Sequence, residues 1–269
     1  MNRLSLLAFA PFLLSLGLSA APKGLLFHAS FDKGTKANLA KGDPQLYSAT
    51  TYKQQDQATP DLVAAPNVTL ATEAGRHGSG ALRFTAKNEN AVFFRAAKNV
   101  NFKSGTIAFW LRLNPDKDLA PDYCDPFQLT EKAYNDSAIW VDFTKDEKPR
   151  HFRLGVFGIL KSWQASSPGP DKDAAFNNRL IVVQKPPFSA DQWTHIVITH
   201  QGLGTPKGKA ALYVNGTLIG NPAAVAEPFA WDPAKTTLRL GINYIGLLDD
   251  LMVFNRPLSA PEIHTLAHK

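Results

Sequence analysis

The stretch from Gly241 to Ile263 constrains the fold more than any other part of the chain. Leu247 to Phe254 is an apolar run interrupted only by two aspartates, and turn formers bound it, which predicts a buried strand. Pro257 ends the strand because proline has no N–H to donate to a ladder. Ser259-Ala-Pro-Glu262 then matches a capping box. A central strand, a proline stop and a short C-terminal helix are therefore predicted as the last elements.

The rest of the chain shows short strand patterns at regular spacing and almost no helical periodicity. Ser137–Thr144 and His151–Phe157 are predicted to pair as a hairpin, and Asn215-Gly216 is the strongest hairpin-turn signal. No repeat of solenoid or propeller length is visible. These patterns favour an all-β fold, in which two antiparallel sheets form a sandwich as a single domain over residues 21–269.

Two polar stretches are expected to be irregular. Asp116–Thr130 is broken by prolines, and Lys161–Asn178 contains Pro168-Gly-Pro170. Long loops on a rigid sandwich often carry binding residues, so these segments are candidates for a functional surface.

The N-terminus has the pattern of a signal peptide over residues 1–20. Arg3 supplies the positive charge, Leu4–Leu18 the apolar region, and Ser19-Ala-Ala21 the small residues before cleavage. The competing interpretation is a membrane anchor, but the run is short for a span and contains Pro11. The sequence therefore predicts a protein that is secreted or held in the periplasm or cell envelope, with no membrane span in the mature chain.

Composition sets further bounds on partners. The net charge is +6, yet the lysines are spread along the chain and no basic–aromatic motif appears, so no nucleic-acid partner is expected. An acidic glycan or an ordinary solvated surface would both account for the charge. Cys124 is the only cysteine, so no disulfide forms within the chain, and a small buried residue is the favoured interpretation.

The closing stretch and four earlier pieces of the chain form a set of motifs in a fixed order. The closing stretch contributes Gly246, Asp249-Asp250, Val253–Arg256, Leu258-Ser259 and Glu262-Ile263. The earlier pieces are Gly78–Phe84, Thr106–Trp110, Trp193–His195 and Leu212–Gly216. Together they resemble the laminin G-like domains of the concanavalin A-like lectin/glucanase superfamily. The resemblance implies a jelly-roll sandwich that is usually secreted and often binds carbohydrate or protein. It does not imply a single activity.

Catalysis of the glucanase type is not expected. Those enzymes place acidic residues alternately on one strand, whereas Asp249 and Asp250 are adjacent and are expected to point to opposite faces of the sheet. The histidines form no HExxH spacing, so a zinc site is not expected either. No catalytic residue is assigned.

A calcium site is one hypothesis for Asp249, which is expected on the core face with Leu251 and Val253. A buried carboxylate must be paired, hydrogen-bonded or bound to metal, and Asp32 at the end of the first strand is expected nearby. Asp32, Asp249 and backbone oxygens would then hold the ion. The alternative, which is favoured, is a carboxylate that caps backbone amides.

Three aromatic residues are the candidate ligand contacts, because flat rings can stack on sugar C–H groups. Tyr123, Tyr134 and Trp163 lie in the polar segments beside acidic and amide residues. Trp110, Trp140 and Trp193, in contrast, are expected in the core.

The sequence thus predicts a secreted, non-catalytic binding module for a glycan or an extracellular protein. Two alternatives stay open: a divergent glycan-active enzyme, either a glycoside hydrolase or a polysaccharide lyase, and a structural module of the envelope or of adhesion.

Overall fold

Strand β18 (Gly246–Phe254) is central in the computed structural model, which describes residues 23–164, 173–220 and 223–269. It pairs antiparallel with β8 (Gly105–Arg112) on one side and with β1 (Leu25–Ala29) on the other. This confirms the central position predicted from the apolar run. Residues 1–20, the expected signal peptide, lie outside the described residues.

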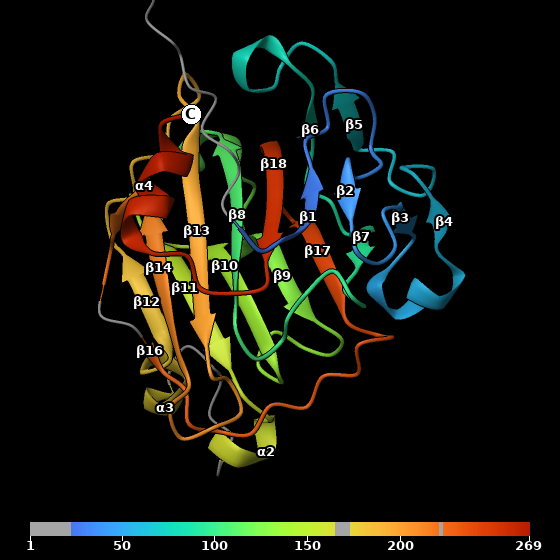
Figure 1. Cartoon of the computed structure of the whole chain (residues 1–269). Coiled ribbons are helices and arrows are strands. Elements are labelled where there is room, and N and C mark those ends of the chain that lie inside the picture. Colours follow the sequence, from blue (N-terminus) through green and yellow to red (C-terminus); the bar gives the residue numbers. More distant parts are fainter. Residues whose placement is uncertain (1–22, 165–172, 221–222) are drawn as a thin grey trace, which may run out of the picture.

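Sheet A is the layer nearer the viewer in Figure 1. It is 10-stranded, in the order β15-β14-β13-β8-β18-β1-β2, with β16 on β14, β6 on β18 and β5 on β6. The other strands of sheet A are β2 (Leu39–Ala40), β5 (Val68–Ala71), β6 (Ala81–Phe84), β13 (Thr194–Gln201), β14 (Lys209–Val214), β15 (Thr217–Leu218) and β16 (Ala223–Ala224).

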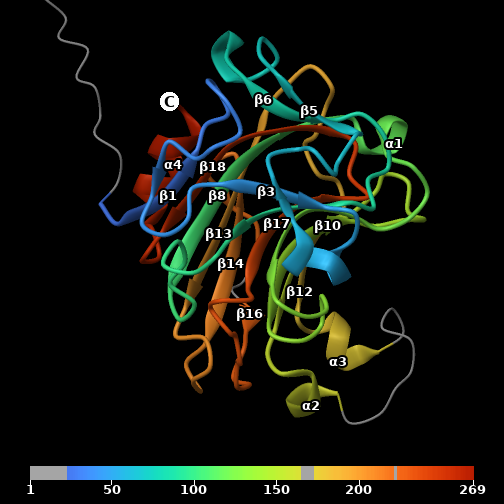
Figure 2. The same cartoon turned by 90° about the vertical axis from the view of Figure 1, so that its right-hand side faces the viewer.

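Sheet B lies behind sheet A, and the two layers are seen edge-on in Figure 2. It is 8-stranded, in the order β12-β11-β10-β9-β17-β7-β3-β4. Its strands are β3 (Leu46–Ala49), β4 (Thr59–Pro60), β7 (Ala91–Arg95), β9 (Cys124–Thr130), β10 (Ala138–Phe143), β11 (Phe152–Phe157), β12 (Leu180–Val183) and β17 (Thr237–Ile242). Two antiparallel sheets packed face to face confirm the predicted jelly-roll sandwich.

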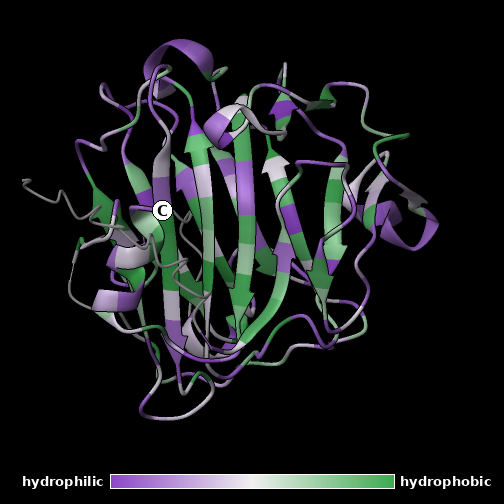
Figure 3. Ribbon diagram, turned by 45° about the horizontal axis from the view of Figure 1, so that its top comes forward, coloured by the Kyte–Doolittle hydropathy of each residue, from purple (hydrophilic) through white to green (hydrophobic). Residues whose placement is uncertain are grey.

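The core fills the space between the sheets with aromatic and aliphatic side chains. Phe109 of sheet A stacks on Phe127 of sheet B at 5.4 Å between ring centroids, and Phe27 meets Phe94 edge-on at 4.8 Å. Each buried phenylalanine contributes roughly 1.5–3 kcal/mol. The strands carry most of the hydrophobic residues and the connecting loops are largely hydrophilic (Figure 3).

The predicted closing helix is α4 (Ala260–Ala267), which lies over the outer face of sheet A (Figure 1). Ser259 and Glu262 form the capping box, and Arg256 donates to both carboxylate oxygens of Glu262. Ile263 and Leu266 are buried against the sheet. Capping at one end and burial of one face therefore hold this short helix in place.

Both predicted hairpin features are present. β10 and β11 pair residue by residue from Ala138↔Phe157 to Phe143↔Phe152. Asn215 and Gly216 have φ of 49° and 79°, as a tight turn with two positive φ values requires. The remaining helices are short: α1 (Pro115–Asp118), α2 (Leu160–Trp163), α3 (Ala174–Asn177) and the 3-10 turns Tyr52–Gln57 and Arg76–Gly78.

One predicted loop is partly wrong. Asp116–Thr130 was expected to be irregular, but β9 begins at Cys124 and pairs with both β10 and β17. Phe127 and Leu129 point into the core, and that burial offsets the N–H that Pro126 cannot donate to the ladder. A strand here has consequences for the site described next.

Candidate functional site

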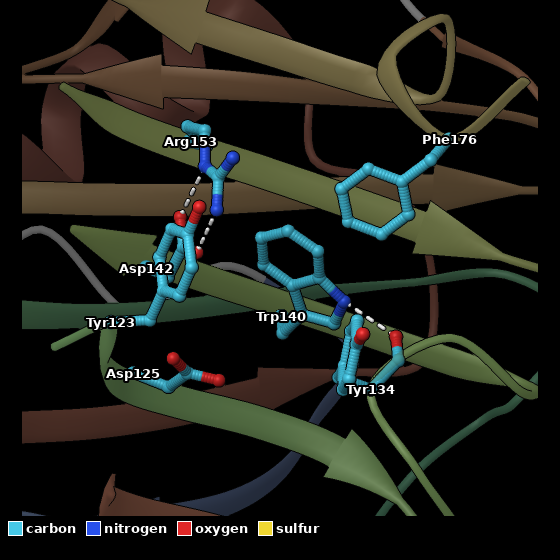
Figure 4. Close-up of a pocket in the computed structure, with 7 residues that line it drawn as sticks. All are labelled: Tyr123, Asp125, Tyr134, Trp140, Asp142, Arg153 and Phe176. Atoms are coloured by element: carbon cyan, nitrogen blue, oxygen red, sulfur yellow. Dashed lines mark hydrogen bonds and ion pairs between the residues drawn. The ribbon is translucent and has the colours of Figure 1, made fainter. Parts of the chain in front are cut away.

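A pocket opens on the outer face of sheet B, where β9, β10 and β11 lie side by side next to α3 (Figure 4). Its volume is about 170 Å³. It is lined by Tyr123, Asp125, Tyr134, Trp140, Asp142, Arg153 and Phe176. Aromatic rings thus surround a small group of charged side chains.

The alternation of side chains along β10 places two of these residues in the pocket. Ile139, Val141 and Phe143 are part of the core, so Trp140 and Asp142 point to the outer face. Because both faces of this strand are covered, all six of its residues are buried.

Gly155 makes room for the Trp140 indole on the neighbouring strand. The two residues are register partners, and a Cβ at Gly155 would lie 2.2 Å from the Trp140 ring. Trp140 Nε1 donates to the Tyr134 backbone oxygen at 2.6 Å. The indole therefore fixes the turn that carries Tyr134, which is 37% exposed at the pocket rim.

Asp142 and Arg153 form a bidentate pair at the base of the pocket. Arg153 Nε donates to Asp142 Oδ1 at 2.8 Å, and its Nη2 donates to the other oxygen (Figure 4). The guanidinium also lies under the Tyr123 ring, 4.9 Å from its centroid. Both charged side chains are buried, and removing one partner of such a pair costs about 3–5 kcal/mol.

Asp125 is the second carboxyl group of the pocket, and its pKa is raised. Burial and, after it, the nearby Asp142 charge raise its pKa, a hydrogen bond from Gln128 and the Arg153 charge lower it, and the net result is a pKa of about 8. A carboxyl group with such a pKa is largely protonated at neutral pH, so it can donate a hydrogen bond as well as accept one.

The structure brings together two of the three predicted ligand residues. Tyr123 and Tyr134 line the pocket. Trp163 does not: it is buried, packs on Phe157 and Phe176, and donates from Nε1 to the Asn135 backbone oxygen at 3.1 Å. Trp163 therefore lies behind Phe176 and supports the wall of the pocket.

Sequence reasoning missed five of the lining residues: Asp125, Trp140, Asp142, Arg153 and Phe176. Trp140 and Trp110 were expected in the core but lie on the outer faces of sheets B and A, buried under other side chains. The sequence predicts a loop at Asp125. The alternating Phe127 and Leu129 that follow it are the signal that could have identified the strand.

The two predicted calcium ligands lie at the other sheet. The prediction that Asp249 shares the core face with Leu251 is wrong, because a β-bulge between Asp249 and Met252 shifts the register and Asp250 takes φ 50°. Asp249 therefore pairs with Trp110 on the outer face, and Asp250 binds His28 and Arg76 there. The expectation that the two aspartates point to opposite faces is also wrong.

Both oxygens of Asp249 accept backbone hydrogen bonds. Oδ2 accepts from Arg76 N and Oδ1 from Asp250 N, each at 2.8 Å. Burial raises the pKa of Asp249 to about 7, and the charge of the exposed Asp32 contributes to the same shift. The contacts favour the backbone-capping alternative. Among residues 23–164, 173–220 and 223–269, no group of three or more His, Cys, Asp or Glu side chains could hold a metal ion.

Cys124 is buried, as the favoured interpretation had it, and burial raises the pKa of its thiol to about 12. Such a thiol is not reactive at neutral pH. In the described part of the chain, no helix is long and apolar enough to cross a membrane.

Solved structures with the same fold include domains of enzymes and of toxins. Domain 4 of AbnA, an extracellular arabinanase of Geobacillus stearothermophilus solved with arabinotriose, is 16% identical with a TM-score of 0.54, covering 91% of this chain and all of that one. The receptor-binding domain of the botulinum neurotoxin C/D mosaic serotype is 11% identical with a TM-score of 0.60, and the match covers 91% of this chain and 51% of that one. Trypanosoma rangeli sialidase is 13% identical with a TM-score of 0.54, covering 93% of this chain and 33% of that one.

At these identities the likeness shows the fold alone. No curated protein sequence matches the chain significantly. A family model does match: Laminin_G_3, described as concanavalin A-like lectin/glucanases superfamily, covers residues 84–264, from the end of β6 to the middle of α4. The chain therefore belongs to the Laminin_G_3 family of the concanavalin A-like lectin/glucanases superfamily.

Proposed function

We propose that this protein is an exported, non-catalytic carbohydrate-binding module whose ligand occupies the pocket of sheet B. The observation that carries the proposal is the pocket itself, in which Tyr123, Tyr134, Trp140 and Phe176 surround hydrogen-bonding groups. Flat apolar ring faces beside a few fixed polar groups suit a sugar, which presents C–H faces and hydroxyl edges.

The size of the pocket supports a ligand that enters by one ring. Its volume of about 170 Å³ is below the roughly 300–1,000 Å³ typical of whole-ligand sites. A single terminal or branch residue of a longer glycan is therefore the proposed occupant. Two structures of the same fold support carbohydrate as the ligand class by analogy: the arabinanase domain solved with arabinotriose, and the binding domain of botulinum neurotoxin DC solved with SialylT, which is 14% identical with a TM-score of 0.57.

The test is a glycan array probed with the mature protein and with Tyr134→Ala, which removes an exposed ring from the pocket rim. We expect the wild type to bind a defined set of glycans and the variant to lose at least about tenfold in affinity, since stacking and burial of one ring contribute about 1.5 kcal/mol or more. Tyr47→Ala, an aromatic substitution on β3 of the same sheet but outside the pocket, is the matched control. Glycan binding that survives both substitutions, or no glycan binding by the wild type, would reject the proposal.

A second candidate function is glycoside hydrolysis, which the pair of carboxyl groups favours. Asp125, with its raised pKa, would act as general acid, and Asp142, paired with Arg153, would act as base or nucleophile. Incubation of the protein with the glycans that it binds on the array distinguishes binding alone from hydrolysis. Release of reducing ends that Asp125→Asn abolishes would establish the enzyme.

Export belongs to the same proposal. The N-terminal pattern of Arg3, Leu4–Leu18 and Ser19-Ala-Ala21 supports it. N-terminal sequencing of the protein recovered outside the cytoplasm should find a chain that begins close to residue 21.

A further inference from the structure

Asp125 differs from the other carboxyl group of the pocket in its partners. Asp142 receives two N–H groups of Arg153, whereas Asp125 Oδ2 accepts a hydrogen bond from the uncharged Gln128 side chain. In the part of the chain that the structure describes, no lysine, arginine or histidine forms an ion pair with Asp125. The pocket therefore contains a carboxyl group without a bound cation.

The nearby charges do not compensate the negative charge of an ionised Asp125. Asp142 on β10 and Asp122 before β9 both disfavour its ionised form. Arg153 on β11 favours it but is already bound to Asp142. Lys145 lies 5.5 Å from the Tyr123 ring centroid and pairs with Asp146, and Lys87 pairs with Asp122. Once Asp125 is ionised, the lining residues carry one more negative than positive charge.

The walls of the pocket also favour a cation. Tyr123, Trp140, Tyr134 and Phe176 offer ring faces, which attract positive charge through their quadrupole. A carboxylate at the end of an aromatic pocket is a common way to bind an ammonium group. The protein as a whole does not attract cations, because its net charge is +6. Attraction of a cationic ligand is therefore a property of the pocket itself.

Building on the proposed carbohydrate site, we propose that the pocket selects a sugar ring with a free amino group and pairs that ammonium with the Asp125 carboxylate. The ring would lie against the aromatic walls. A neutral sugar of the same shape would leave Asp125 protonated and would gain no ion pair. An N-acetylated sugar would lose the charge and would also have to fit an extra group into the small pocket.

Three trisaccharides of one backbone test this selection by isothermal titration calorimetry: cellotriose, tri-N-acetylchitotriose and fully deacetylated chitotriose. They share the β-1,4-linked ring and differ at C2. We expect the deacetylated trimer to bind at least about tenfold more tightly than either of the others, because a charge-assisted hydrogen bond replaces a neutral one. Asp125→Asn should reduce this preference to less than about threefold. Asp191→Asn, the same charge change at an exposed position, should preserve it.

Equal binding of the three trimers by the wild type would overturn the amino-sugar selection and leave the carbohydrate site intact. This comparison needs no variant, so it holds even if Asp125→Asn does not fold. A preference that survives in a folded Asp125→Asn would also overturn it. Tetramethylammonium that competes as well as the amino trimer would show that the ring plays no part. If none of the trimers binds, the selection fails, and the glycan array decides separately whether the protein binds carbohydrate.

Discussion

At the scale of single residues, two carboxyl groups in the described part of the chain have raised pKa values, one on each sheet. Asp125 has a pKa of about 8 and Asp249 one of about 7, and burial is the main cause in both. Asp125 accepts a hydrogen bond from the Gln128 side chain and Asp249 accepts two from backbone N–H groups, yet neither has an ion-pair partner among the described residues. Such groups make stability depend on pH.

The sign of that dependence follows from the direction of the shifts. An unfolded aspartate has a pKa of roughly 3.9, so between about pH 4 and 8 the unfolded chain has released protons that the folded protein still holds. Buried His195 and His200 oppose this below about pH 6.5, because burial lowers their pKa values to about 3 and about 4 and the unfolded chain then holds the extra protons. Above about pH 6.5, where the unfolded histidines are neutral, the unfolding free energy should fall as pH rises. Asp125→Asn should flatten the curve, while Asp249 continues to contribute up to about pH 7.

Urea denaturation from about pH 6.5 to about pH 8.5, above the pKa of an unfolded histidine, measures this effect. Asp191→Asn, at an exposed position, should leave the slope unchanged. A parent protein whose stability rises steadily with pH over this range would contradict the assignment of raised pKa values to both groups.

Asp249 also decides the calcium hypothesis. As a cap for Arg76 N and Asp250 N it needs no ion, so a chelator should leave the melting temperature unchanged. Asp249→Asn, which keeps one acceptor oxygen, should cost on the order of 1 kcal/mol. If chelation lowers the melting temperature and Asp249→Asn removes that response, Asp249 and Asp32 hold a metal ion instead, since an ion that binds only the folded state stabilises it by mass action.

At the scale of elements, the closing segment links a turn, a strand and a helix. The Asn215-Gly216 turn sits against α4: a Cβ at Gly216 would lie 3.3 Å from both His264 and Ala267. The bulge at Asp249 and Asp250 turns both aspartates toward Arg76 and so connects β18 to the 3-10 turn at Arg76–Gly78. The tight turn and the bulge thus hold α4 and the 3-10 turn against sheet A.

Gly216→Val should therefore destabilise the protein for two reasons. A β-branched residue would have to adopt φ near 79°, and its side chain would press on α4. The expected loss is on the order of 1–3 kcal/mol, visible as a lower melting temperature. Gly78→Val, at an exposed site where φ is 74° and no atom lies within 4 Å of a Cβ, separates the backbone effect from the contact with α4. An unchanged melting temperature for Gly216→Val would mean that the turn is not held as described.

At the scale of the whole molecule, the fold followed from the sequence more readily than the site did. Apolar alternation and turn residues are local, so they predicted the central β18, the β10–β11 hairpin and the capped α4. The site depends on side-chain direction across three strands. The sequence predicts Trp140 in the core because it lies in a strand. Both faces of β10 are in fact buried, and alternation alone does not say which face meets the other sheet.

The missed strand had the larger effect on the site. Pro126 suggested a loop, but its position in a strand with buried Phe127 and Leu129 is stabilised by packing that a local pattern does not report. Asp125 could not be placed in the pocket without that strand. The bulge at Asp249 was likewise invisible, since it depends on the pairing of β18 with β8.

The central claim is that ligand binds on sheet B, and the tryptophan side chains can report it directly. The chain has five tryptophans, of which Trp140 lines the pocket and Trp110 lies on the outer face of sheet A. Titration of an array-positive glycan, followed through the indole N–H signals in a ¹H–¹⁵N NMR spectrum, compares the two faces in one sample. We expect the Trp140 signal to shift most, because its N–H is bound to Tyr134 at the pocket rim, while the Trp110 signal stays in place. A saturable shift of Trp110 with Trp140 unmoved would contradict the claim and place the ligand on sheet A.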